Sequence, residues 1–179
     1  MKRFTASMDR STRILTVIIC LIIMASMLSL FLTLGDSPEQ RVIAGFAAIL
    51  ILGSLVAAYA FHPRSYRIEG GKLIIQKGIG RKEIQLNGIS AVREVNKNDL
   101  GKGVRTFGVG GLFGYFGKFY FSKVGTVTAY VTHPGKTILI TTQAHQYYLI
   151  SPGDTLGFMN SIHEELPALH PFTETTIVP

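Results

Sequence analysis

The chain has 179 residues, a formal net charge of +7, a mean hydropathy of +0.31 and one cysteine, Cys20. A single cysteine excludes an intrachain disulfide and a multi-thiolate metal site. The basic residues are interspersed with acidic ones and form no dense stripe, which argues against nucleic acid as a partner.

Two apolar runs near the N-terminus, 14–34 and 42–61, contain no Asp, Glu, Lys, Arg or His. At about 1.5 Å of rise per residue, runs of 21 and 20 residues reach roughly 30 Å, the thickness of a bilayer's hydrocarbon core. A secretory signal has a shorter apolar stretch of about 7 to 15 residues, so the first run is too long for one. We therefore predict two transmembrane helices over 14–34 and 42–61, joined by an external loop over 35–41.

The charges that flank these runs predict their orientation. Residues 1–13 carry four basic residues and one acid, and Arg64 and Arg67 follow the second run, whereas the connecting loop has one basic residue and two acids. Because Lys and Arg in short loops favour the cytoplasmic side, we expect both termini to be cytoplasmic. Residues 1–13 form a cytoplasmic N-terminal segment in this interpretation.

Beyond residue 65 the chain changes to short strand-like stretches separated by turn residues. Gly70-Gly71 and Gly78-Ile79-Gly80 predict tight turns, and over 126–132 Val, Ala and Val alternate with polar or amphipathic residues as in a half-buried antiparallel strand. We predict a single mainly-β domain over 65–166, closed or nearly closed as a barrel, so that the whole chain is of the α+β class. The expected strands are 66–69, 72–77, 81–86, 126–132, 137–141 and 146–150.

A C-terminal helix follows the last strand. Ser151 is followed directly by Pro152, and Asp154 comes three residues after it. This pattern predicts a helix start with Ser151 as its N-cap. Apolar residues then recur at helical spacing up to Leu166. Residues 167–179 contain three prolines and no apolar periodicity, and we expect them to be a disordered tail.

A segment rich in glycine and aromatic residues lies between the two groups of strands. Seven of the 15 residues from Phe107 to Phe121 are aromatic and five are glycine. With Arg105-Thr106-Phe107-Gly108-Val109-Gly110-Gly111-Leu112-Phe113-Gly114-Tyr115-Phe116-Gly117, and with Leu149-Ile150-Ser151-Pro152 after it, the chain resembles bacterial membrane proteins that contain a bacterial pleckstrin-homology (PH) domain.

The resemblance covers about residues 65–166 and implies a PH-like barrel on a two-helix anchor in the bacterial plasma (inner) membrane. It implies no catalytic residue, and the family's molecular activity is largely undefined. The expected function is therefore non-catalytic binding or scaffolding at the cytoplasmic face, with a protein partner or a second copy of the chain. Two alternatives stay open, namely an anionic lipid-headgroup sensor and an accessory subunit of a membrane transport or stress complex.

The aromatic-glycine segment allows two interpretations. In the first interpretation, its rings pack into the barrel wall, because aromatic side chains cover glycines of neighbouring strands. Alternatively, an aromatic loop with Lys118 and Lys123 enters the headgroup region, where amphipathic rings are favoured. The candidate residues of this segment are Phe107, Phe113, Tyr115, Phe116 and Phe119.

A basic hairpin provides the candidate headgroup contacts. Lys77, Arg81 and Lys82 flank the turn at 78–80, and Lys118 is a further candidate contact for a headgroup or a partner. The alternative is that these residues only keep a hairpin soluble.

Motifs for catalysis are incomplete in this sequence. His163-Glu164 begins like a zinc-helix motif but has no second histidine, and no Gly-Lys-Ser/Thr phosphate loop occurs. We therefore expect no enzyme activity, no cofactor and no metal site.

Overall fold

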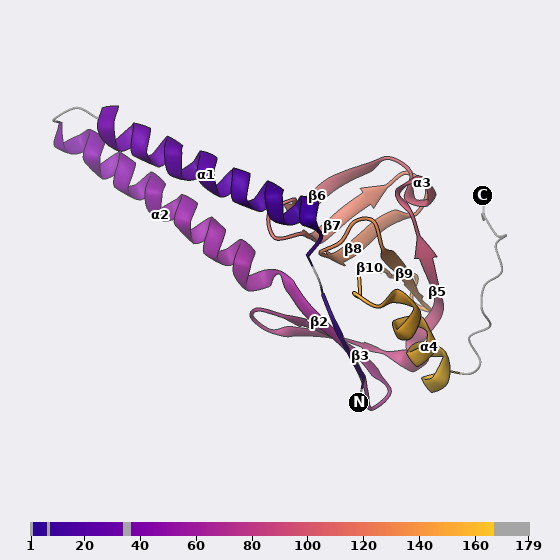
Figure 1. Cartoon of the computed structure of the whole chain (residues 1–179). Helices are drawn as coiled ribbons and strands as arrows, with labels where there is room; N and C mark the ends of the chain where they lie inside the picture. The colour runs from indigo at the N-terminus through magenta and orange to yellow at the C-terminus, as the bar shows by residue number, and fades with distance from the viewer. Residues whose placement is uncertain (1, 7, 34–36, 167–179) are drawn as a thin grey trace.

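The computed structural model describes residues 2–6, 8–33 and 37–166, so the expected tail over 167–179 lies outside the described residues. Helices α1 (Arg10–Thr33) and α2 (Pro38–Phe61) project together from one side of a strand-rich domain (Figure 1). Each is long and apolar enough to cross a membrane, over Arg10–Leu30 and Pro38–Phe61, and very little of either stretch is buried. Exposed apolar helices of this length are what a bilayer would cover.

The helical hairpin is inserted between two adjacent strands of one sheet. Strand β1 (Lys2–Thr5) precedes α1 and pairs antiparallel with β2 (Pro63–Glu69), which follows α2, with Lys2 opposite Ile68 and Thr5 opposite Ser65. No sequence pattern predicts a strand in this N-terminal segment. A strand of four residues that are mostly charged or polar has no periodic pattern, and it forms here because β2 offers an edge.

The first sheet has the order β1-β2-β3-β4, with β3 at Lys72–Lys77 and β4 at Arg81–Gln85. The β2–β3 turn uses Gly70 and Gly71 at φ of 57° and 69°, a backbone region that glycine adopts without strain. The predicted hairpins of this part are confirmed.

The second sheet has the order β5-β9-β10-β8-β7-β6. A short 3₁₀ turn, η1 (Leu86–Gly88), joins the two sheets, and a short helix, α3 (Lys97–Leu100), follows β5. Strand β10 lies between β8 and β9, antiparallel to β9 and parallel to β8, so the short β8–β9 connection passes the end of β10. The strands are β5 (Ile89–Val95), β6 (Gly103–Gly110), β7 (Tyr115–Phe121), β8 (Gly125–Val131), β9 (Thr137–Thr142) and β10 (Tyr147–Ile150).

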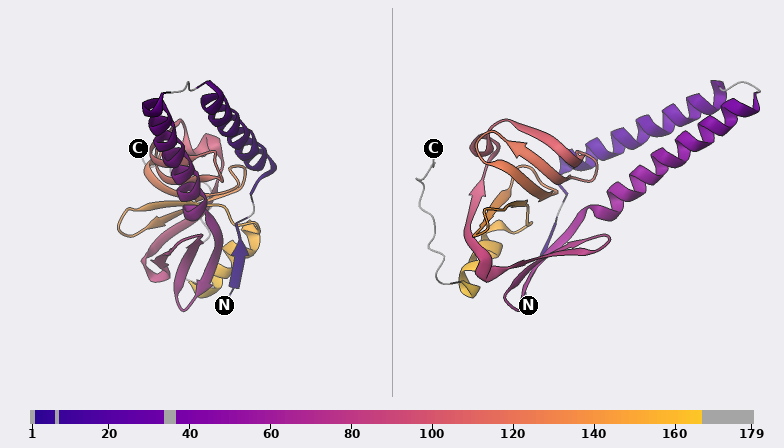
Figure 2. Two further views of the ribbon diagram at one scale, coloured as in Figure 1. Left: turned by 90° about the vertical axis from the view of Figure 1, so that its left-hand side faces the viewer. Right: turned by 180° about the vertical axis from the view of Figure 1, so that it is seen from behind.

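The main core lies between the two sheets and helix α4 (Thr155–Glu165), which is seen from two further sides in Figure 2. Tyr66 is fully buried there, and its hydroxyl donates to the Tyr130 carbonyl oxygen at 2.6 Å. Burial raises the pKa of Tyr66 to about 12, because the phenolate has no water to solvate it. The α+β class and the mainly-β domain with one C-terminal helix are thus confirmed.

The predicted start of the C-terminal helix is wrong. Helix α4 begins at Thr155, and the carboxylate of Asp154, its N-cap, accepts from the Gly157 N–H at 2.9 Å. Ser151 instead remains with the end of β10, where its hydroxyl accepts from the backbone N–H groups of Thr132 and His133 at 2.8 and 3.1 Å. The serine that looked like a helix cap therefore holds the β8–β9 turn.

Candidate membrane-interface site and sheet groove

The loop between β6 and β7 docks against the ends of both long helices. The Phe113 N–H donates to Thr16 Oγ1 of α1 at 3.0 Å, and Thr16 is buried. On α2, the rings of Tyr59 and Phe113 meet edge to face with centroids 5.4 Å apart. The tip of this hairpin therefore joins the domain to both long helices.

Two facing glycines allow β6 and β7 to approach closely. Gly108 and Gly117 are opposite each other at φ of 114° and 119°. A Cβ added to Gly108 would lie 2.2 Å from the Phe116 carbonyl oxygen, and one added to Gly117 would lie 2.3 Å from the Phe107 carbonyl oxygen. Neither position can carry a side chain unless the backbone moves.

The five candidate aromatic residues occupy different environments. Phe116 and Phe119 are buried on opposite faces of β7, and Tyr115 is half-buried. Phe113 lies at the helix junction, whereas Phe107 is 77% exposed. The segment therefore contributes to the core, to the helix junction and to the surface, and neither of the two interpretations covers all of it.

An exposed apolar patch lies on one face of the β6–β7 hairpin. Val104 is opposite Tyr120 and Phe107 is opposite Lys118, so all four side chains share one face. Val104, Phe107 and Tyr120 are all exposed. We call these four residues the outer patch.

The basic hairpin does not bring its three candidate residues together. Arg81 is opposite Gln76 and Lys82 is opposite Ile75, so strand alternation turns these two cations to opposite faces. Arg81 forms an ion pair with Glu83 at 2.8 Å, and Lys82 lies 5.7 Å from the Tyr148 ring centroid. A hydrogen bond from Lys72 and its charge lower the pKa of Glu83.

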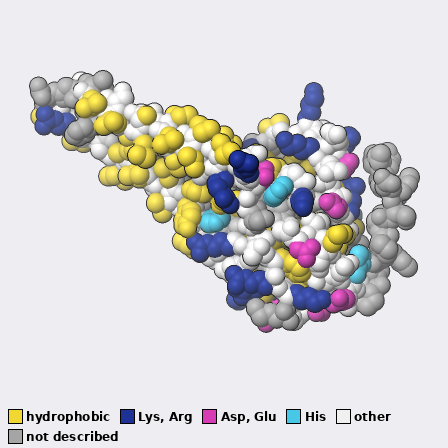
Figure 3. All heavy atoms as spheres, viewed as in Figure 1, with side chains coloured by type: hydrophobic (Ala, Val, Ile, Leu, Met, Phe, Trp, Pro, Cys, Tyr) yellow, Lys and Arg dark blue, Asp and Glu magenta, His cyan; other side chains and the backbone are white. Residues whose placement is uncertain are grey.

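The tip of that hairpin nevertheless contacts the end of α2. The Ile79 N–H donates to the Ala60 carbonyl oxygen at 2.6 Å, and the Lys77 ammonium lies 5.5 Å from the centroid of the Phe61 ring. Figure 3 shows hydrophobic side chains covering the two helices, and Lys and Arg side chains gathered where the helices meet the domain. The hairpin tip thus lies at the boundary between the apolar helices and the charged domain.

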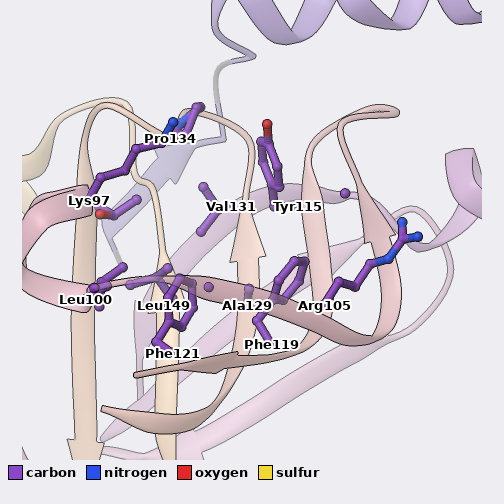
Figure 4. A pocket seen from close by; sticks show the side chains of 14 residues that line it. Lys97, Leu100, Arg105, Tyr115, Phe119, Phe121, Ala129, Val131, Pro134 and Leu149 are labelled. Carbon is purple, nitrogen blue, oxygen red and sulfur yellow. The ribbon is translucent and has the colours of Figure 1, made fainter. Parts of the chain in front are cut away.

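A groove of about 500 Å³ follows the face of the six-stranded sheet that points away from the main core (Figure 4). Its walls are mainly apolar and come from β6, β7, β8, β9, β10, the β8–β9 turn and the α3 region. Lys97 and Arg105 are the two charged residues that line it, and they lie on opposite sides of it in this view. We call this feature the sheet groove.

The sequence profile of the bacterial PH domain family matches residues 64–166, which is more than half of the chain. This chain belongs to the bacterial PH domain family. Comparisons with curated proteins and with solved structures found no match.

The match to the bacterial PH domain begins within β2 and ends at residue 166, directly after α4. It therefore leaves out β1 and both long helices. PH domains are generally non-catalytic binding modules. Within the described residues of this bacterial PH domain protein, no group of three or more His, Cys, Asp or Glu side chains could hold a metal ion. The described surface carries an apolar patch, a basic hairpin tip and a groove.

Sequence reasoning missed the sheet groove and the outer patch of this PH domain. The groove is formed by residues from six separate elements and the β8–β9 turn, which no linear motif connects. Of its two cations, Arg105 was visible only as part of the aromatic-glycine segment. The signal that was available is the density of aromatic residues in β7, where alternate residues face opposite sides of the sheet.

Proposed function

We propose that this bacterial PH domain protein is a non-catalytic binding module that α1 and α2 anchor in the bacterial plasma membrane, where it holds a partner protein at the cytoplasmic face. The outer patch carries the proposal. Val104, Phe107 and Tyr120 are 64%, 77% and 49% exposed on one face of one hairpin, and Lys118 lies among them. Aromatic residues that gather on a surface are typical of the centres of protein interfaces.

The attachment of the domain to its anchor supports this function. The β6–β7 loop contacts both helices, so the outer patch is held at a set distance from the bilayer instead of moving on a flexible linker. A scaffold benefits from such a rigid attachment, because it does not have to order a tether when a partner binds.

Site-specific photocrosslinking in cells tests the proposal. Benzoylphenylalanine in place of Phe107 should give adducts heavier than the chain, whereas the same residue in place of Arg93, which is exposed on β5 at the opposite edge of the sheet, should not. An adduct of twice the chain mass would identify the partner as a second copy. Equal yields at the two positions, or no adduct at Phe107, would contradict the proposal.

The β3–β4 tip favours a second candidate function, the sensing of anionic lipid headgroups. Its backbone is hydrogen-bonded to the last turn of α2, so Lys77 and Arg81 lie near the leaflet if α2 spans the membrane. Amide exchange over 78–81 in nanodiscs of phosphatidylglycerol should be slower than in phosphatidylcholine, and high salt should remove the difference. Lys77→Gln should reduce the effect and Lys102→Gln, on an exposed residue beyond α3, should not. Equal exchange in both lipids excludes this function.

A further inference from the structure

The sheet groove is separate from the outer patch because a bulge turns neighbouring residues of β6 to opposite faces. Arg105 is opposite Phe119, and Phe107 is opposite Lys118, with Thr106 as the extra residue between them. Without this bulge, Arg105 and Phe107 would share a face. With it, Arg105 joins Phe119 in the groove and Phe107 joins the outer patch.

The interior of the groove is apolar. Leu100, Phe119, Ala129 and Leu149 are buried and belong to one hydrophobic cluster, and the side chains of Leu100, Phe119, Phe121, Ala129 and Leu149 lie together along the floor in Figure 4. The volume of about 500 Å³ is within the range of about 300 to 1,000 Å³ that is usual for small-molecule sites. A hydrocarbon chain suits such a lining, because it buries apolar surface and leaves no polar group unpaired.

The rim of the groove is cationic. Lys97 and Arg105 are both exposed, and none of the described residues that line the groove is Asp or Glu. Among the described residues, neither cation forms an ion pair within the domain. The Arg105 side chain passes over Gly110, where a Cβ would lie 3.7 Å from its Cδ. An anionic group at this rim would therefore meet unneutralised positive charge.

The cationic rim lies at the end of the sheet that is nearest the anchor. Strand pairing places Gly110, Tyr115 and Val131 side by side at one end of the sheet. At that same end, a Cβ added to Gly111 would lie 3.0 Å from Leu15 Cδ2 of α1, and the Asp9 N–H donates to the Thr132 carbonyl oxygen at 3.3 Å. The groove therefore opens toward the position where a leaflet would surround the helices.

We propose that the sheet groove binds one acyl chain of an anionic membrane lipid, with the chain on the apolar floor and the headgroup at Arg105 and Lys97. The proposal rests on the membrane placement in the proposed function, but it does not depend on a protein partner at the outer patch. Its occupant comes from the bilayer in which the protein is anchored.

The test uses the full chain in nanodiscs that contain phosphatidylglycerol with a photoreactive diazirine near the end of one acyl chain. Labelling of α1 and α2 reports that the protein is in the bilayer, independently of the groove. Peptides that carry Phe119, Phe121 or Leu149 should be labelled as well, and several-fold less when a zwitterionic phosphatidylcholine probe replaces the anionic one. Labelling confined to α1 and α2 would overturn the proposal.

Three variants locate the site. Ala129→Phe fills the floor and should abolish labelling of the groove, while α1 and α2 remain labelled. Arg105→Glu should reduce groove labelling roughly tenfold, as expected for the loss of a charge-assisted contact. Lys118→Glu makes the same charge change on the opposite face of the same hairpin and should have no effect.

The charge variants decide the question if Ala129→Phe does not fold, since Arg105 is exposed and its replacement removes no core contact. Equal groove labelling in Arg105→Glu and Lys118→Glu would overturn the proposal. Failure of this test with normal labelling of α1 and α2 would leave the membrane anchor and the outer patch intact.

Discussion

At the scale of single residues, backbone conformation decides which side chain faces which surface in the β6–β7 hairpin. Gly108 and Gly117 let the two strands approach more closely than any Cβ would allow. The bulge at Thr106 turns Arg105 toward the sheet groove and Phe107 toward the opposite face of the hairpin. The glycines of this segment are thus required by the backbone itself. The packing of aromatic rings over glycines explains only part of why glycine occurs at these positions.

Gly117→Ala should lower the free energy of unfolding of the domain by roughly 2 to 3 kcal/mol, because a φ of 119° strains alanine and its Cβ would meet the Phe107 carbonyl oxygen. Gly88→Ala is the matched control, since its φ is not positive and open space surrounds the added Cβ. It should change the free energy by less than about 0.5 kcal/mol. Urea unfolding of the full chain in micelles, followed by tyrosine fluorescence, measures both. Similar effects of the two substitutions would contradict the structure of this hairpin.

At the scale of elements, the N-terminal strand makes the anchor part of the domain. Strand β1 extends the first sheet, and the ring of its Phe4 meets Phe158 of α4 edge to face with centroids 5.3 Å apart. The helical hairpin therefore begins after one strand and ends before another, and these two strands pair in the same sheet. Removal of residues 2–5 would expose the edge of β2 and part of the core.

Phe4→Ala should lower the free energy of unfolding by about 1 to 2 kcal/mol, because a half-buried aromatic contact is lost. Thr5→Ala, on an exposed residue of the same strand, should stay within about 0.5 kcal/mol of the unsubstituted chain. The measurement is again urea unfolding of the full chain in micelles. If Phe4→Ala behaves like Thr5→Ala, β1 does not contribute to the core.

At the scale of the whole molecule, strand pairing and charge lead to the same expectation for topology. Because β1 and β2 are neighbours, the start of α1 and the end of α2 lie on one side of any membrane that the helices cross. The flanking Lys and Arg residues independently favour the cytoplasmic side for both.

Protease-cleavable tags at the two ends of the chain should therefore be cut together in inside-out membrane vesicles and be protected together in right-side-out vesicles. A cysteine at Ser37, in a chain in which Cys20 is replaced by serine, should react with an impermeant reagent from the opposite side. Cleavage of the two tags in opposite vesicle types would contradict the pairing of β1 with β2.

Much of the fold could be predicted because its signals are local. The long helices follow from charge-free apolar runs, and the β2–β3–β4 hairpins follow from glycine turns between short strands. The start of α4 could not be read in the same way. Ser151, Pro152 and Asp154 form a plausible cap, but the Ser151 hydroxyl is engaged by the β8–β9 turn, and Asp154 caps the helix instead.

The sequence alone determined the two long apolar helices, the mainly-β domain and the presence of a segment rich in glycine and aromatic rings, because hydropathy and turn chemistry act over a few neighbouring residues. Only the tertiary structure decided that β1 pairs with β2, that β10 lies between β8 and β9, and that Arg105 and Phe107 face opposite surfaces. These features depend on strand register and on contacts between residues far apart in the chain. A shift of one residue in register exchanges the two faces of a strand, and no local pattern records which face the rest of the molecule will cover.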